Sequence, residues 1–308
     1  MRASVFMAGD GLARLRRRIA ALEGRPAGGE PPADDGKGLS SAIRPLSSDP
    51  RPPSADPLAP RRGGTTLPFG ILALDRLLQG GLRRAALHEI RGPTMRGAGA
   101  ATGFALGLLS RLLAIDDRPV LVVIEAAARE AGLPYAPGLD RFGLDSGRLV
   151  IVRARKTADL LWAFEEGLRC RGLAAVLAEI KGSSARLDLT ASRRLALRAR
   201  ETGVMGLLLR QAGAAEPGAA ETRFLVEPQP SAILADFPSG IGRPAWRLAL
   251  ERNRHGATGA FDLEWDHGTR SFALAARPAL SLSRLAVSLD RPDPPPNAGA
   301  VVAFRRAS

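Results

Sequence analysis

The sequence has few of the residues that build disulfide frameworks and metal centres. Its 308 residues include 1 cysteine and 3 histidines, so no internal disulfide can form. The histidines (His88, His255 and His267) are dispersed and show no metal-ligand spacing with Cys170. Cys170 falls in a helical pattern, where a buried thiol is expected. We therefore expect neither a disulfide scaffold nor a metal site.

Long apolar runs are also absent. Arginine or glycine interrupts every one of them before it reaches the roughly 20 residues that a membrane helix needs. The N-terminal residues Met1–Phe6 contain no apolar stretch long enough for a signal peptide. A composition of 45% hydrophobic and 24% charged residues is typical of a soluble globular core, so we expect a cytoplasmic protein without a membrane partner.

Lysine is scarce although the chain is strongly basic. Only Lys37, Lys156 and Lys181 are lysines, so arginine supplies nearly all of the charge behind the net value of +13. Such a charge favours nucleic acid as a partner. A bias toward arginine with abundant Ala, Gly and Pro also follows from a GC-rich genome. The composition therefore leaves DNA binding open.

Residues 65–107 carry the most informative pattern. A helix-like stretch, Leu72–Leu78, ends at Gly80-Gly81, and a strand is predicted over Leu87–Arg91. A glycine-rich turn follows and opens onto an apolar helical pattern. Strand, glycine-rich turn and helix are the parts of a phosphate-binding loop.

The pattern G-x-x-x-x-G-K-[ST] is matched in its frame but not in its reactive side chains. Gly92 and Gly97 take the two glycine positions, whereas Ala98 replaces the lysine and Gly99 the hydroxyl residue. The residues between the glycines are Pro93, Thr94, Met95 and Arg96. The lysine would reach the β- and γ-phosphates and the hydroxyl would hold Mg²⁺. Backbone N–H groups could still cradle an anion, and Arg96 lies two residues too early to replace the lysine. Three interpretations of the loop stay open: a turn without a ligand, weak nucleotide binding and ATP hydrolysis.

These segments resemble the start of the RecA-type ATPase core. The matching pieces are Leu74–Leu78, Gly80–Leu82 and Glu89–Pro93. Within that superfamily the degenerate loop, the strand Leu87–Ile90 and the later arginine-rich segments look most like the ImuA family, RecA-like accessory proteins of bacterial damage-induced mutagenesis. The resemblance covers residues 65–275 and implies a RecA-like α/β core.

Hydrophobic patterns after the loop predict a mainly parallel sheet flanked by helices. Continuous apolar strands, typical of a sheet covered on both faces, are expected over Pro119–Glu125, Leu149–Arg153, Ala174–Ile180 and Val204–Arg210. Helices are expected over Ala100–Ile115, Thr157–Arg171 and Ala191–Thr202. Later strands, expected to form an antiparallel part, are Phe224–Gln229, Arg247–Leu250 and Gly259–Trp265.

The resemblance also locates two acidic positions of RecA-type ATPases. Ala127 takes the place of the glutamate that activates the attacking water, with Glu125 and Glu130 as alternatives. Glu179 takes the place of the Walker B acid, but the Mg²⁺ site is incomplete without a hydroxyl at Gly99. We expect no catalytic residue, no metal and no cofactor, while weak ATP binding stays open.

Four arginines are candidate basic contacts. Arg252 and Arg254 match the tract by which RecA protomers reach a neighbour's nucleotide, and an exposed turn is the alternative. Arg193 and Arg194 give their helix a basic side, for which simple solvation is the alternative.

The segment Ala212–Thr222, which follows the polar Gln211, consists of small residues without lysine or arginine. Its composition predicts a flexible loop that does not grip DNA in the manner of RecA.

Composition divides the chain into four segments. We expect an amphipathic N-terminal helix in residues 1–24 and a disordered Pro/Gly-rich linker in 25–64. The RecA-like domain would span 65–275, and 276–308 would be a flexible tail suited to partner docking.

By resemblance, the chain is a non-catalytic accessory factor of damage-induced (SOS) error-prone translesion DNA synthesis. The partners that this implies are an ImuB-type Y-family polymerase homologue and an error-prone replicative-type DNA polymerase, with RecA as a further candidate. Two alternatives stay open: a DNA-dependent ATPase of the RecA/RadA type and a cell-division inhibitor of the SulA type.

Overall fold

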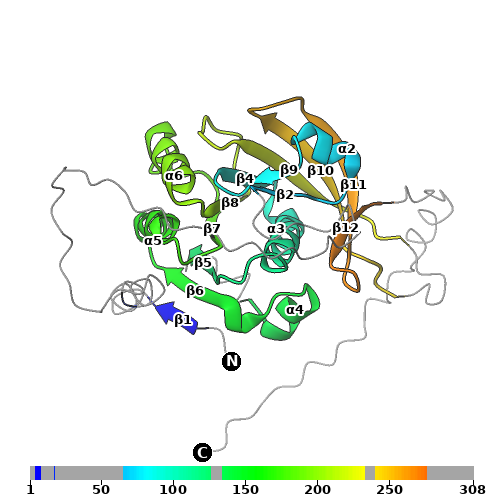
Figure 1. Cartoon of the computed structure of the whole chain (residues 1–308), viewed down its shortest axis with the longest axis horizontal. Helices are drawn as coiled ribbons and strands as arrows, with labels where there is room; N and C mark the ends of the chain where they lie inside the picture. Colours follow the sequence, from blue (N-terminus) through cyan, green and yellow to red (C-terminus); the bar gives the residue numbers. More distant parts are fainter. Residues whose placement is uncertain (1–3, 8–16, 18–64, 126–133, 233–239, 276–308) are drawn as a thin grey trace, which may run out of the picture. The chain divides into compact units, whose positions relative to one another are not determined.

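The computed structural model describes residues 4–7, 17, 65–125, 134–232 and 240–275. They form an α/β fold in which helices flank a ten-stranded, mainly parallel sheet (Figure 1). The expected fold class is therefore confirmed. Within these ranges no helix is long and apolar enough to cross a membrane.

The strands of the large sheet are β1 (Ser4–Met7), β4 (Leu87–Gly92), β5 (Val120–Glu125), β6 (Leu149–Ala154), β7 (Ala175–Lys181), β8 (Met205–Gln211), β9 (Thr222–Gln229), β10 (Ala245–Asn253), β11 (Gly259–Asp266) and β12 (Ser271–Leu274). A separate two-stranded sheet pairs β2 (Thr66–Leu67) with β3 (Leu82–Arg83). The helices are α2 (Leu72–Leu77), α3 (Ala98–Leu113), α4 (Ala136–Arg141), α5 (Thr157–Arg169) and α6 (Leu189–Thr202), with 3₁₀ turns η1 (Met95–Gly97) and η3 (Ser146–Arg148).

The strand order is β1-β6-β5-β7-β8-β4-β9-β10-β11-β12. All neighbours from β1 to β9 run parallel, and β10 to β12 run antiparallel to their neighbours. Strand β9 was expected in the antiparallel part, and it does pair antiparallel with β10, but it also pairs in parallel with β4, which was not predicted. The connection from β8 crosses over β4 and delivers β9 to the far side of β4 in a parallel direction, so that Ile90 of β4 pairs with both Leu209 and Phe224.

Helix α3 packs on one face of the sheet, where the large aromatic side chains gather. The ring of Phe272 lies 5.4 Å from Phe69, 5.5 Å from Phe104 and 4.9 Å from Trp265, measured between ring centroids. A Cβ at Gly107 would lie 2.8 Å from the Phe272 ring, so glycine lets α3 approach this cluster. Burial of such rings is a large contribution to the stability of this half of the core.

Helices α5 and α6 cover the other face with mainly aliphatic side chains. Leu160, Phe164, Leu168 and Leu195 are all buried there. The thiol of Cys170 belongs to the same cluster and is buried as expected, although the residue lies at the end of α5 and not within the helix.

The glycine pair after α2 is required by a close approach of two chain segments. Gly81 has a φ of +121°, and a Cβ there would lie 2.3 Å from the carbonyl oxygen of Leu67. Only glycine fits that backbone conformation and that contact. This explains why the Gly80-Gly81 signal was informative in the sequence.

Strand β1 was not predicted. It pairs in parallel with β6, with Phe6 opposite Val152. A helix was expected in residues 1–24. Of these, the structure describes residues 4–7, which form β1, and Arg17, which is helical. The predictions for residues 25–64 and 276–308 lie outside the described residues.

His88 is a fully buried polar side chain that joins three strands. Its Nε2 lies 2.8 Å from the carbonyl oxygen of Arg83 on β3, and its Nδ1 lies 2.8 Å from the hydroxyl of Thr222 on β9. Because a carbonyl only accepts, Nε2–H donates to Arg83 and neutral Nδ1 accepts from Thr222. Burial lowers the pKa of His88 below its ordinary value, so the ring is held neutral.

This lowered pKa predicts a stability loss in mild acid. The unfolded chain takes up the proton near its ordinary pKa of 6.5 while the folded chain does not, so stability is complete above that value and falls as the pH drops below it. The unfolding free energy changes with pH by at most about 1.4 kcal/mol per pH unit for this one proton. Urea unfolding from about pH 8 to about pH 5.5 should show it.

The matched variant is His88→Asn, which should be less stable than the parent at neutral pH because it loses the bonds to Arg83 and Thr222. The difference in unfolding free energy between the two proteins should shrink as the pH falls. A difference that stays constant over this range would contradict the assignment of a neutral buried ring.

Candidate functional site

The glycine-rich loop lies at the carboxyl end of β4. The strand ends at Gly92, a 3₁₀ turn covers Met95–Gly97, and α3 begins at Ala98. No side chain caps the first turn of α3, and a Cβ at Gly99 would meet nothing within 4 Å. Strand, turn and helix thus follow in the expected order, with Thr94, Met95 and Arg96 exposed.

Gln211, at the end of β8, joins the loop to the neighbouring strand. Its buried amide nitrogen lies 3.1 Å from Oε1 of Glu179 on β7, 3.0 Å from the hydroxyl of Thr102 and 3.3 Å from the carbonyl oxygen of Ala98 on α3. Burial raises the pKa of Glu179, and the hydrogen bond from Gln211 opposes that rise. The Walker B-like acid, Glu179, is therefore part of a cluster of hydrogen bonds within the chain.

Of the three positions considered for the catalytic base, the structure describes only Glu125. Ala127 and Glu130 lie outside the described residues. Glu125, the remaining alternative base, accepts a hydrogen bond of 2.8 Å from the hydroxyl of Thr157. Across the described part of the chain, no group of three or more His, Cys, Asp or Glu side chains could hold a metal ion.

The connection from β8 to β9, residues 212–221, crosses the α6 face of β4 without forming a helix. Its composition predicted flexibility, but side chains from outside bind its backbone. Three arginines donate to its carbonyl oxygens: Arg91 to Gly213 (3.0 Å), Arg252 to Gly218 and Arg254 to Ala220 (3.3 Å). The hydroxyl of Ser192 on α6 accepts a hydrogen bond of 2.6 Å from the N–H of Ala219. These bonds supply partners that a helix or ladder would otherwise provide. We call residues 212–221 the crossover loop.

Under the crossover loop lies a buried ion-pair cluster centred on Glu89, which is 2% exposed. Its carboxylate lies 2.8 Å from Nε of Arg223 and 3.3 Å from Nη1 of Arg210. Arg210 also bonds the carboxylate of Glu216 in the loop at 2.8 Å. A hydrogen bond from Ser183 lowers the pKa of Glu216, and the charges of Arg210 and Arg223 lower it further. Two carboxylates thus face two guanidinium groups.

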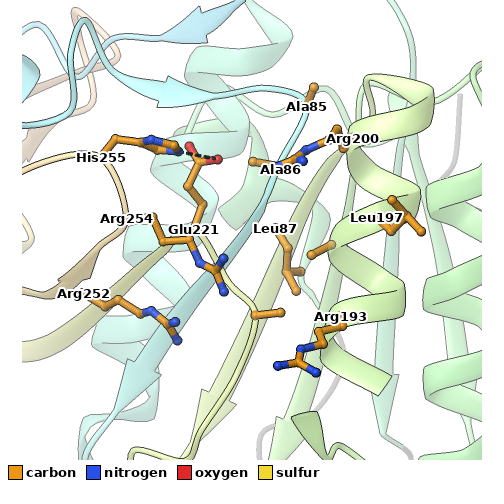
Figure 2. A pocket seen from close by; sticks show the side chains of 12 residues that line it. Ala85, Ala86, Leu87, Arg193, Leu197, Arg200, Glu221, Arg252, Arg254 and His255 are labelled. Atoms are coloured by element: carbon orange, nitrogen blue, oxygen red, sulfur yellow. Dashed lines mark ion pairs between the residues drawn. The ribbon is translucent and has the colours of Figure 1, made fainter. Parts of the chain in front are cut away.

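A pocket of about 610 Å³ opens at the amino ends of β4 and β9, the edge opposite to the glycine-rich loop. We call it the basic pocket; Figure 2 shows Arg193 of α6 and Arg252 of β10 entering it from opposite sides. Its lining residues are Ala85, Ala86, Leu87, Arg193, Ala196, Leu197, Arg200, Ala219, Glu221, Arg252, Arg254 and His255.

The structure brings together three of the four nominated arginines. Arg193, Arg252 and Arg254 line the basic pocket, whereas Arg194 points to α5 and pairs with Glu165 at 2.8 Å. The exposed-turn alternative is wrong for Arg252, because this residue is partly buried within β10.

The basic pocket carries an excess of positive charge. Its carboxylate, Glu221, is already near Nε2 of His255 (3.4 Å) and Nε of Arg83 (3.5 Å). Partial burial lowers the pKa of Arg252, and repulsion from Arg254 and Arg223 lowers it further. Arg193 and Arg200 have no acidic partner among the described residues, so the pocket can attract an anion.

The Glu89 cluster was not predicted, although the sequence carries a signal for it. Glu89 lies inside an otherwise apolar strand pattern, and Arg210 and Arg223 lie at the ends of two others. A charge in a strand that is buried on both faces has to find a partner. Three such strands predict a buried ion pair, without saying which charges meet.

The buried cluster predicts a large effect of Glu89→Gln. The change leaves Arg210 and Arg223 buried with less compensating charge, which should lower the unfolding free energy by about 3 kcal/mol. The matched control is Glu165→Gln, which breaks a surface pair and should cost less than about 1 kcal/mol. Urea unfolding measures both variants, and equal effects would contradict a structural role for the cluster.

Comparison with known proteins gives two related matches. Over 226 residues the chain is 35% identical to Protein ImuA of Caulobacter vibrioides, in the strains NA1000 / CB15N and ATCC 19089 / CIP 103742 / CB 15. The match covers 68% of this chain and 89% of each relative. No protein-family model matches the sequence.

Proposed function

This chain belongs to the ImuA family, and we propose that it is a non-catalytic accessory protein of damage-induced, error-prone translesion DNA synthesis. It works through contacts with other proteins and not by turning over a nucleotide. The α/β domain serves as the docking platform.

The composition and bonding of the glycine-rich edge support a non-catalytic role. Ala98 and Gly99 stand where a lysine and a hydroxyl would bind the phosphates and Mg²⁺. Glu179, at the Walker B-like position, is engaged by Gln211, which also bonds Thr102. In this arrangement hydrogen bonds within the protein join the end of β7, the end of β8 and the start of α3.

Family resemblance supplies the class of partners. They are an ImuB-type Y-family polymerase homologue and an error-prone replicative-type DNA polymerase, with RecA as a further partner. The match over 89% of relatives named ImuA favours this role over that of a SulA-type division inhibitor. A working RecA/RadA-type ATPase is disfavoured by Ala98 and Gly99.

Affinity purification of the tagged full chain from DNA-damaged cells tests the accessory role. We expect mass spectrometry to identify a Y-family polymerase homologue or RecA, because these are the partners that the family implies. Undamaged cells are the control. Recovery of only a tubulin-like division protein, or of no partner, would contradict the proposed function. The purification is repeated with a tagged protein that lacks residues 277–308. Loss of the partner from this protein would place the contact in residues 277–308.

A further inference from the structure

We propose that the basic pocket binds an acidic segment of a partner protein. The carboxylates of that segment would lie on the pocket's arginines, and one aliphatic side chain would lie on its apolar wall. This inference deepens the proposed function and rests on it only for the partner being a protein.

The charge distribution of the pocket selects an anionic ligand. Arg193 and Arg200 come from one face of α6, seven residues apart in the numbering and therefore two helical turns apart. Arg252 and Arg254 enter from β10 and the residues that follow it (Figure 2). Glu221 offsets only part of this charge, since His255 and Arg83 already lie against it. Guanidinium groups spread over two elements suit several carboxylates along an extended segment better than a single anion.

The arginines of β10 are oriented before any ligand arrives. Arg252 donates one N–H to the oxygen of Gly218, and Arg254 donates its Nε–H to the oxygen of Ala220. The crossover loop that offers these oxygens is itself fixed to α6 through Ser192. Each guanidinium keeps further N–H groups without a partner among the described residues. Such preorganisation reduces the entropy lost on binding.

The pocket also has an apolar wall, which a phosphate-binding groove does not need. Leu197 of α6 is 52% exposed at its rim, and Ala86 and Leu87 are buried at its floor. An aliphatic side chain that covers Leu197 would remove apolar surface from water, which is favourable. The wall therefore favours a peptide with both acidic and aliphatic residues.

Nucleic acid fits this pocket less well. Single-stranded nucleic acid is commonly held by aromatic side chains on which the bases stack. None of the twelve lining residues is a Phe, Tyr or Trp. The pocket is a single compartment of about 610 Å³, a volume within the range of sites that hold one compact group.

Binding of a labelled peptide to the purified full chain tests the inference. The probe is a short fluorescent peptide in which a leucine is flanked by glutamates, and anisotropy reports its affinity. Because Arg193 and Arg200 each supply an exposed charge, Arg193→Ala and Arg200→Ala should each weaken binding about three- to five-fold. The matched control is Arg194→Ala, which removes the same charge from the next residue of α6 but outside the pocket. It should change the affinity less than about two-fold.

Three outcomes would overturn the inference. The first is no measurable binding of the peptide. The second is an equal loss of affinity in Arg193→Ala and Arg194→Ala, which would indicate general attraction to a basic protein. The third is an oligothymidylate that binds more tightly than the peptide and responds to Arg193→Ala but not to Arg194→Ala, which would assign the pocket to phosphates.

The same variants separate this inference from the proposed function. If a protein carrying both Arg193→Ala and Arg200→Ala still recovers the polymerase homologue from damaged cells, the pocket inference fails and the accessory role stands. If the parent protein binds the peptide but recovers no partner, the accessory role fails alone.

Discussion

A carboxylate buried between two arginines holds the centre of this molecule together. Glu89 on β4 binds Arg223 of β9 and Arg210 of β8, and Arg210 in turn holds Glu216 of the crossover loop. The connection over β4 has no helix to satisfy its backbone, so the arginines around it take that task. The loop in turn accepts hydrogen bonds from Arg252 and Arg254, two of the four arginines of the basic pocket. One buried charge cluster thus links the core of the sheet to a surface site.

The two edges of the sheet have different characters. At the carboxyl ends of the strands, Gln211 joins Glu179 to Thr102, so that polar groups of the glycine-rich edge bind one another. At the amino ends, Arg193 and Arg200 face the basic pocket and have no acidic partner among the described residues. Hydrogen bonds among Glu179, Gln211 and Thr102 suit a structural role, whereas arginines without an acidic partner suit binding. This contrast underlies the account of the domain as a binding scaffold.

Local signals made much of this fold predictable. Continuous apolar strands, the Gly80-Gly81 pair and the turn at Gly92 gave the parallel sheet and the start of α3 close to where they lie. The parallel pairing of β9 with β4 was missed, because it depends on which strand the crossover loop passes, and no local residue indicates that. Residues of the basic pocket were predicted singly, Arg193 from the basic side of its helix and Arg252 from the resemblance to RecA, but their convergence is a property of the fold. Arg194 shows the limit, since it is identical in type and adjacent in sequence yet faces α5.

Phosphate release by the purified full chain, with ATP, Mg²⁺ and single-stranded DNA, tests the central claim of a non-catalytic scaffold most directly. The matched control is Gly97→Ala, where an added Cβ meets Pro228 only at an ordinary contact distance of 3.4 Å. No release above that of the control is expected, because Ala98 and Gly99 lack the lysine and hydroxyl side chains that engage the phosphates and Mg²⁺ during hydrolysis. Release that single-stranded DNA stimulates and Gly97→Ala abolishes would contradict it.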